Sequence, residues 1–179
     1  MVGYYYMLLD GYWKKELKHN ARQLDFWIKV SGKVSIYAEH KVNKYILYSA
    51  VIIRKMFEDE KGAETAFKKS NMHMPALELL KYKVKVTTYP FSGNKNFIIE
   101  RAIPENYNQE KAVDEEIALN TLCNQIIHSF VWSVVHEQDS LKICEVVFAS
   151  DKEKANVLYA LKLEDFIKAI NFCIEKGTI

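Results

Sequence analysis

The residues best placed by type and spacing to do chemistry are Asn124 and His128, in the segment LCNQIIHSF at positions 122–130. They are four residues apart, so in a helix their side chains share a face. An imidazole titrates near neutral pH, which suits proton transfer during phosphodiester cleavage. The alternative is structural, because a half-buried histidine in an apolar stretch needs a hydrogen-bond partner and Asn124 can help to supply one.

The segment resembles the helical motif of HEPN-domain proteins, which are small helical-bundle domains. That motif is an Arg, then four to six residues, then a His, often with Asn directly after the Arg and apolar residues before the His. Here Asn124, Ile126, Ile127 and His128 match the pattern. The resemblance implies metal-independent RNA cleavage in toxin, CRISPR-linked and anti-phage proteins, often by a dimer whose two motifs face each other.

Cys123 stands where the motif has its Arg. A guanidinium holds a scissile phosphate through fixed bidentate bonds and a permanent charge, which a thiol cannot replace. Either another Arg substitutes, or the domain has lost catalysis. Arg54 is the candidate substitute, because an Arg that emerges from an apolar helix is costly unless it is paired. Its alternative role is a snorkelling side chain or a salt bridge to Glu58, four residues on.

Three functions are compatible with these residues. The first is a non-catalytic interaction module of a small intracellular protein, including a degenerate HEPN-like domain. The second is a metal-independent HEPN-like ribonuclease of a toxin or anti-phage defence system. The third is a small-molecule enzyme whose site the sequence does not reveal. RNA or another protein is the expected partner, with a homodimer as the expected assembly, and no cofactor or metal is expected.

Composition sets wider limits on the class of protein. The 179 residues are 49% apolar and 27% charged, which is typical of a globular chain, and the net charge of +2 does not by itself indicate a nucleic-acid binder. Residues 1–100 have 17 basic and 10 acidic side chains, a charge of +7, whereas residues 101–179 have 8 and 13, a charge of −5. This asymmetry either steers a polyanion toward the N-terminal part or makes the two halves attract each other.

Several common sites have no sequence support. The patterns of phosphate-binding loops, zinc proteases and serine hydrolases do not occur. The chain has three cysteines, Cys123, Cys144 and Cys173. Their odd number, wide spacing and apolar surroundings predict reduced, buried thiols and not a zinc site. The chain starts without a basic leader and has no apolar run of about 18 residues, so we expect a cytoplasmic location and no membrane span.

We expect a single domain over residues 1–179 of the α+β class, a mainly helical bundle with two antiparallel β-hairpins packed as a small sheet. Helical periodicity and stop signals predict helices at 12–30, 36–60, 110–137 and 163–176. Alternating residues around turn signals predict hairpins at 83–101 and 141–161. Because the predicted strands come as adjacent pairs, a parallel sheet is not expected.

Overall fold

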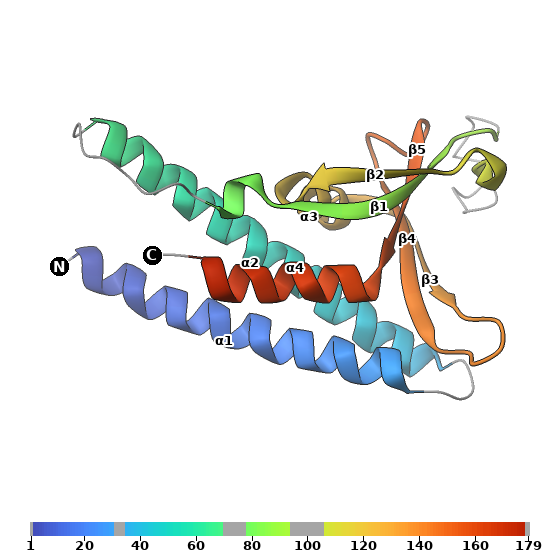
Figure 1. Cartoon of the computed structure of the whole chain (residues 1–179), viewed down its shortest axis with the longest axis horizontal. Coiled ribbons are helices and arrows are strands. Elements are labelled where there is room, and N and C mark those ends of the chain that lie inside the picture. The colour runs from blue at the N-terminus through green and yellow to red at the C-terminus, as the bar shows by residue number, and fades with distance from the viewer. Residues whose placement is uncertain (1, 31–34, 70–77, 94–105, 178–179) are drawn as a thin grey trace.

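The structure is a computed structural model that describes residues 2–30, 35–69, 78–93 and 106–177. Two long helices, α1 (Val2–Lys29) and α2 (Ile36–Lys69), run antiparallel, and α4 (Leu163–Lys176) packs along α1. Figure 1 shows these helices extending from a sheet at one end of the molecule, with both chain ends at the other. The helices therefore extend away from the sheet, which lies at one end of the molecule.

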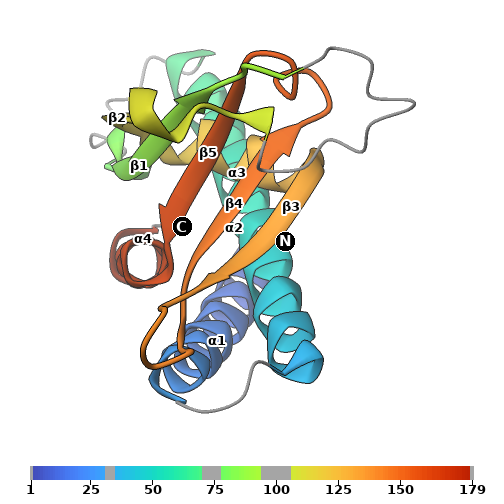
Figure 2. The ribbon, with the colours of Figure 1, turned by 90° about the vertical axis from the view of Figure 1, so that its right-hand side faces the viewer.

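The five strands of the described chain form one antiparallel sheet in the order β2-β1-β5-β4-β3, with β2 and β3 at its edges (Figure 2). The strands are β1 (Lys83–Pro90), β2 (Val113–Ala118), β3 (Ser129–His136), β4 (Ile143–Ser150) and β5 (Val157–Lys162). A short helix, α3 (Leu119–Ile127), connects β2 to the opposite edge strand β3. Single 3-10 turns, η1 (Leu79–Lys81) and η3 (Gln109–Lys111), precede β1 and β2.

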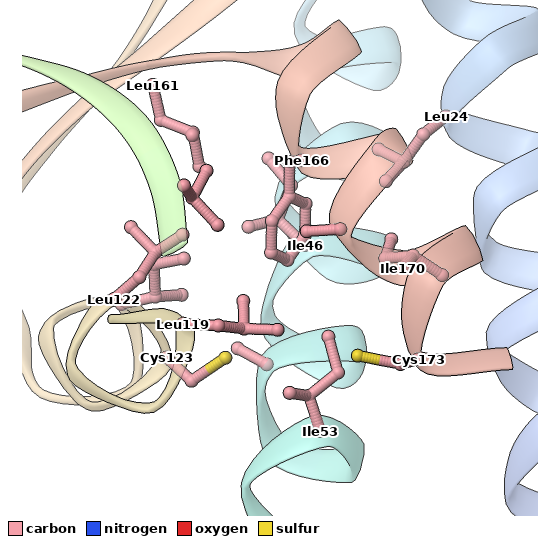
Figure 3. Packing of buried hydrophobic residues seen from close by; sticks show 14 of the residues in the cluster. Leu24, Ile46, Ile53, Leu119, Leu122, Cys123, Leu161, Phe166, Ile170 and Cys173 are labelled. Carbon is pink, nitrogen blue, oxygen red and sulfur yellow. The ribbon is translucent and has the colours of Figure 1, made fainter. Parts of the chain in front are cut away.

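The main core lies between the helices and the inner face of the sheet. Alternation along β1 turns Val84 and Val86 inward and leaves Lys83 and Lys85 exposed. The buried side chains of this core include Leu24, Ile46, Ile53, Leu119, Leu122, Leu161, Phe166 and Ile170, drawn in Figure 3. They come from all four helices and from the sheet, so the N-terminal and C-terminal parts of the chain share one core.

A smaller core covers the outer face of the sheet. Its buried members are Tyr107, Val131, Val147, Ala149, Leu158 and Ala160. Phe91 packs edge-on against the ring of Tyr107, with 5.4 Å between the ring centroids, and the two residues also form an isolated antiparallel bridge. The central strands β4 and β5 are therefore apolar on both faces.

The α+β class expected from the sequence is confirmed, whereas the helical bundle with two separate hairpins is not. Three of the expected helices correspond to α1, α2 and α4, although α1 begins at Val2 and α2 continues to Lys69. Strands β4 and β5 are antiparallel neighbours joined by residues 151–156. The strand expected at 96–101 lies outside the described residues, and β1 pairs with β2 and β5.

The prediction of one helix over residues 110–137 is wrong, because this segment contains β2, α3 and β3 in turn. Cross-strand pairs stabilise the acidic first part of this segment as a strand. Glu116 lies opposite Lys85, and the Thr87 hydroxyl donates to Asp114 Oδ1 at 2.7 Å. The β3 sequence SFVWSVVH is rich in β-branched and aromatic residues, which pack well on a pleated surface. Pairing within the sheet therefore outweighs the helical spacing of its apolar residues.

The position of the core predicts a contrast between two phenylalanines. Phe166 is fully buried, so Phe166→Ala is expected to lower the free energy of unfolding by about 3–5 kcal/mol. Phe26 on α1 is 55% exposed, so Phe26→Ala is expected to change it by no more than about 0.5 kcal/mol. Denaturant unfolding followed by circular dichroism measures both variants. Similar losses for the two would contradict this placement of the core.

Candidate functional site

Helix α3 has one face in the core and one face toward solvent. Its buried residues are Leu119, Leu122, Cys123 and Ile126, at helical spacing. The helix ends at His128, whose backbone N–H donates to the carbonyl oxygen of Asn124 at 3.1 Å. Asn124 is half-buried and His128 is exposed, so both side chains belong to the face that α3 leaves outside the core.

Arg54 of α2 reaches the imidazole of His128. The distance between Arg54 Nη1 and His128 Nε2 is 3.4 Å, although the two residues are 74 positions apart in the sequence. The Nε of the same guanidinium donates to Glu58 Oε1 at 3.3 Å. The guanidinium only donates, so this contact is a hydrogen bond in the tautomer whose proton is on Nδ1 and whose Nε2 is the acceptor. Arg54 thus forms the salt bridge considered from the sequence and also lies at His128.

These side chains line a cleft of about 460 Å³. Its walls are Arg54 from α2, then Asn124, Gln125 and His128 from α3 and its cap, and residues 150–153 at the end of β4 and in the turn that follows. The structure therefore brings the three residues singled out from the sequence, Arg54, Asn124 and His128, to one place on the surface. Packing of α2 against α3 is what joins them.

Two amide oxygens in this cleft lack a hydrogen-bond donor. Asn124 Oδ1 and Gln125 Oε1 are buried and have no partner among the residues that the structure describes. Asn124 therefore does not accept a hydrogen bond from His128 through Oδ1, and the imidazole instead contacts Arg54. Both atoms are shielded from solvent, so neither oxygen is presented to a molecule in the open part of the cleft.

The turn at residues 151–156 forms the remaining wall, and the sequence indicated only that it connects two strands. The Asp151 N–H donates to the carbonyl oxygen of His128 at 3.1 Å, which fixes the turn beside the imidazole. The Tyr107 hydroxyl donates to the carbonyl oxygen of Lys154 at 2.7 Å. Burial raises the pKa of Tyr107 to about 12, so this hydroxyl keeps its proton and remains a donor at neutral pH. The sequence did not predict this wall, because the position of the turn depends on the register in which Ser150 of β4 pairs with Ser129 of β3.

Cys123, at the Arg position of the motif, points away from the cleft. Its side chain is fully buried, and Figure 3 shows the sulfur directed into the core toward Ile53 and Cys173. Burial raises the pKa of the Cys123 thiol well above its ordinary value, so the thiol stays protonated. A guanidinium at position 123 would enter the core, whereas Arg54 approaches His128 from the neighbouring helix.

The cleft is not the only depression on the described surface. Another, of about 580 Å³, lies over β1, β2 and β5 and mixes lysines with carboxylates; its charged residues are Lys83, Lys85, Asp114, Glu115, Glu116, Lys162 and Asp165. Within residues 2–30, 35–69, 78–93 and 106–177, no group of three or more His, Cys, Asp or Glu side chains is arranged to hold a metal ion. None of the described helices is long and apolar enough to span a membrane.

The orientation of Cys123 predicts that an Arg at this position would destabilise the protein. Cys123→Arg places an unpaired cation in the core, so it is expected to lower the free energy of unfolding by at least about 3 kcal/mol. Cys123→Ala removes only the sulfur, so a loss of about 1 kcal/mol is expected. Thermal and denaturant unfolding compare the two variants. An Arg variant as stable as the Ala variant would show that position 123 can face the cleft.

Comparison of the chain with protein-family models, with curated proteins and with solved structures gave no match.

Proposed function

We propose that the cleft formed by Arg54, Asn124 and His128 binds and cleaves RNA without a metal ion, as a ribonuclease of HEPN-like character. The observation that carries this proposal is the contact between Arg54 Nη1 and His128 Nε2 in an open cleft. A guanidinium fits phosphate oxygens in both charge and geometry. A neutral imidazole beside it is a suitable general base at neutral pH. Together they supply the two properties that phosphodiester cleavage needs.

The geometry suggests how substrate would activate the pair. In the free protein, when the proton of the imidazole is on Nδ1, the lone pair on His128 Nε2 accepts from Arg54 Nη1 at 3.4 Å. An incoming phosphate competes for the guanidinium, which leaves Nε2 able to accept a proton from the ribose 2′-hydroxyl. The 2′-oxygen then forms a bond to the adjacent phosphorus, and the bond from phosphorus to the 5′-oxygen breaks. The 5′-oxygen takes up a proton from the imidazolium or from water, and the products are a 2′,3′-cyclic phosphate and a 5′-hydroxyl end.

Two further groups support this assignment. Asn124 lines the cleft one turn before His128, so its amide group lies close to the ribose that the imidazole would deprotonate. Arg54 stabilises the negative charge that develops on the phosphoryl oxygens when the 2′-oxygen attacks. The cleft also contains Asp151, whose carboxylate is compensated by Lys154, with Nζ 2.5 Å from Oδ1. Asp151 therefore does not present an uncompensated charge to the phosphate.

The test is cleavage of single-stranded RNA in EDTA by wild-type protein and by variants. His128→Ala is expected to reduce the rate by about 10²–10⁴-fold because it removes the general base. Arg54→Ala is expected to lose a similar factor, with Arg54→Lys recovering only part of it, because an ammonium lacks the planar fork. The measurement is the rate of formation of 2′,3′-cyclic phosphate ends, resolved by chromatography.

A histidine outside the cleft provides the matched control. His19 is exposed on α1, where its ring packs edge-on against Tyr45 at 5.9 Å, so His19→Ala is expected to cleave at the wild-type rate. Equal losses in His19→Ala and His128→Ala would point to a general loss of folding. No cleavage by the folded wild-type protein would reject the ribonuclease and leave the interaction module as the proposed function.

The interaction module is the second candidate, favoured by the exposed face of α2. Leu47, Tyr48 and Val51 are between 41% and 54% exposed on this helix, an unusual concentration of apolar surface for a helix that is otherwise packed. The occupant we assign to this face is a second copy of the chain. Val51 lies one turn before Arg54, so a homodimer formed here would bring the cleft of each copy to the edge of the interface.

This assignment predicts a dimer that depends on Val51. Wild-type protein is expected to sediment as a dimer, and Val51→Glu as a monomer, because a buried unpaired carboxylate at each copy opposes association. Phe26→Glu, on the exposed side of α1, is expected to leave the dimer unchanged. Sedimentation velocity measures all three. A monomeric wild type at micromolar concentration would reject α2 as a self-association surface.

A further inference from the structure

An exposed aromatic side chain, Phe130, follows His128 by two residues, at an irregularity in the edge strand β3. In the pairing of β3 with β4, Ser129 lies opposite Ser150 and Val131 lies opposite Ala149. Phe130 therefore has no residue opposite it on β4 and forms a bulge. Bulges bend a strand and redirect a side chain, and they are enriched beside active sites. Phe130 is 52% exposed, whereas Val131 next to it is buried in the outer core. The bulge therefore presents a large apolar ring to solvent.

The turn that borders the cleft also contacts this ring. Lys154 Nζ lies 3.8 Å from the centroid of Phe130 and 2.5 Å from Asp151 Oδ1. The backbone of Asp151 in turn contacts His128, as described above. Phe130 follows His128 by two residues, so their Cα atoms are within about 7 Å of each other. The ring is thus connected to the wall of the cleft through Lys154 and Asp151, which belong to one short turn.

We propose that Phe130 is a base-stacking platform and that the ligand of the cleft is single-stranded RNA with an unpaired base on this ring. This inference rests on the proposed ribonuclease, because the phosphate next to the stacked base is the one that Arg54 and His128 would receive. Lys154 covers part of the ring by a cation–π contact, and the rest of the ring is open to solvent. An aromatic ring stacks on an unpaired base, whereas a base inside a duplex is already stacked on its neighbours.

The alternative roles of Phe130 fit the structure less well. A core role is excluded, because the ring is more than half exposed while the neighbouring residues of the outer core are buried. Edge protection of β3 does not require an aromatic ring, since charged side chains and the bulge itself serve that purpose. The platform also gives the cleft a means to select its ligand. Arg54 contacts phosphate, which every nucleic acid has, whereas a ring at Phe130 selects strands with accessible bases.

The test is direct binding of a short fluorescent RNA, measured by anisotropy as a single strand and as a blunt duplex of the same sequence. A His128→Ala background keeps the RNA intact. Adding Phe130→Ala is expected to weaken binding of the single strand by about 10- to 100-fold and to leave duplex binding unchanged. Adding Phe130→Trp is expected to restore single-strand binding, because the indole also stacks. Adding Phe26→Ala, which removes an equally exposed ring on α1, is expected to change neither.

The outcomes separate the platform from the ribonuclease. Single-strand binding that is unaffected by Phe130→Ala, or equal binding of strand and duplex before mutation, would overturn the platform and leave the ribonuclease in place if the cleavage assay is positive. Absence of RNA binding together with absence of cleavage would overturn both. Loss of binding in Phe130→Ala without recovery in Phe130→Trp would assign the residue a local packing role and overturn the platform.

Discussion

The apolar contact between α2 and α3 is the interaction on which the cleft depends. Helix α3 has nine residues, too few to be stable alone in water, so tertiary packing must hold it. Leu122 and Cys123 are buried against the same core as Ile53 of α2, and each fully buried apolar side chain contributes roughly 1.5–3 kcal/mol. Arg54 follows Ile53 directly, so the packing that buries one residue places the next beside His128.

The same helix thus supplies both core and cleft, through successive residues. Cys123 enters the core and Asn124 lines the cleft, because neighbouring positions on a helix point about 100° apart. Position 123 is therefore constrained by packing and cannot also supply a cation to the surface. The guanidinium must come from another element, and α2 is the helix that packs against this face of α3.

The sheet contributes the other half of the cleft. Ser150 pairs with Ser129, so the turn that leaves β4 begins next to the residue that follows His128. Tyr107, from the outer core, holds the far end of this turn through the carbonyl oxygen of Lys154. The bulge at Phe130 lies between the Ser129–Ser150 pair and the Val131–Ala149 pair. Cleft and exposed ring are therefore positioned by strand register, and a shift of one residue would move every one of these side chains to the other face.

The sequence by itself determined the α+β class, the long helices α1, α2 and α4, and the short list of residues able to do chemistry. These follow from local causes: helical periodicity, a turn signal between two apolar strands, and the scarcity of histidine and arginine in apolar segments. Only the tertiary structure decided that residues 113–118 and 129–136 are strands, because their cross-strand pairing with β1 and β4 outweighs the helical spacing of their apolar residues. It also decided that Arg54 meets His128 across 74 residues, and that residues 150–153 complete the wall. Contacts of that range depend on the packing of whole elements, which the spacing of residues along one element does not encode.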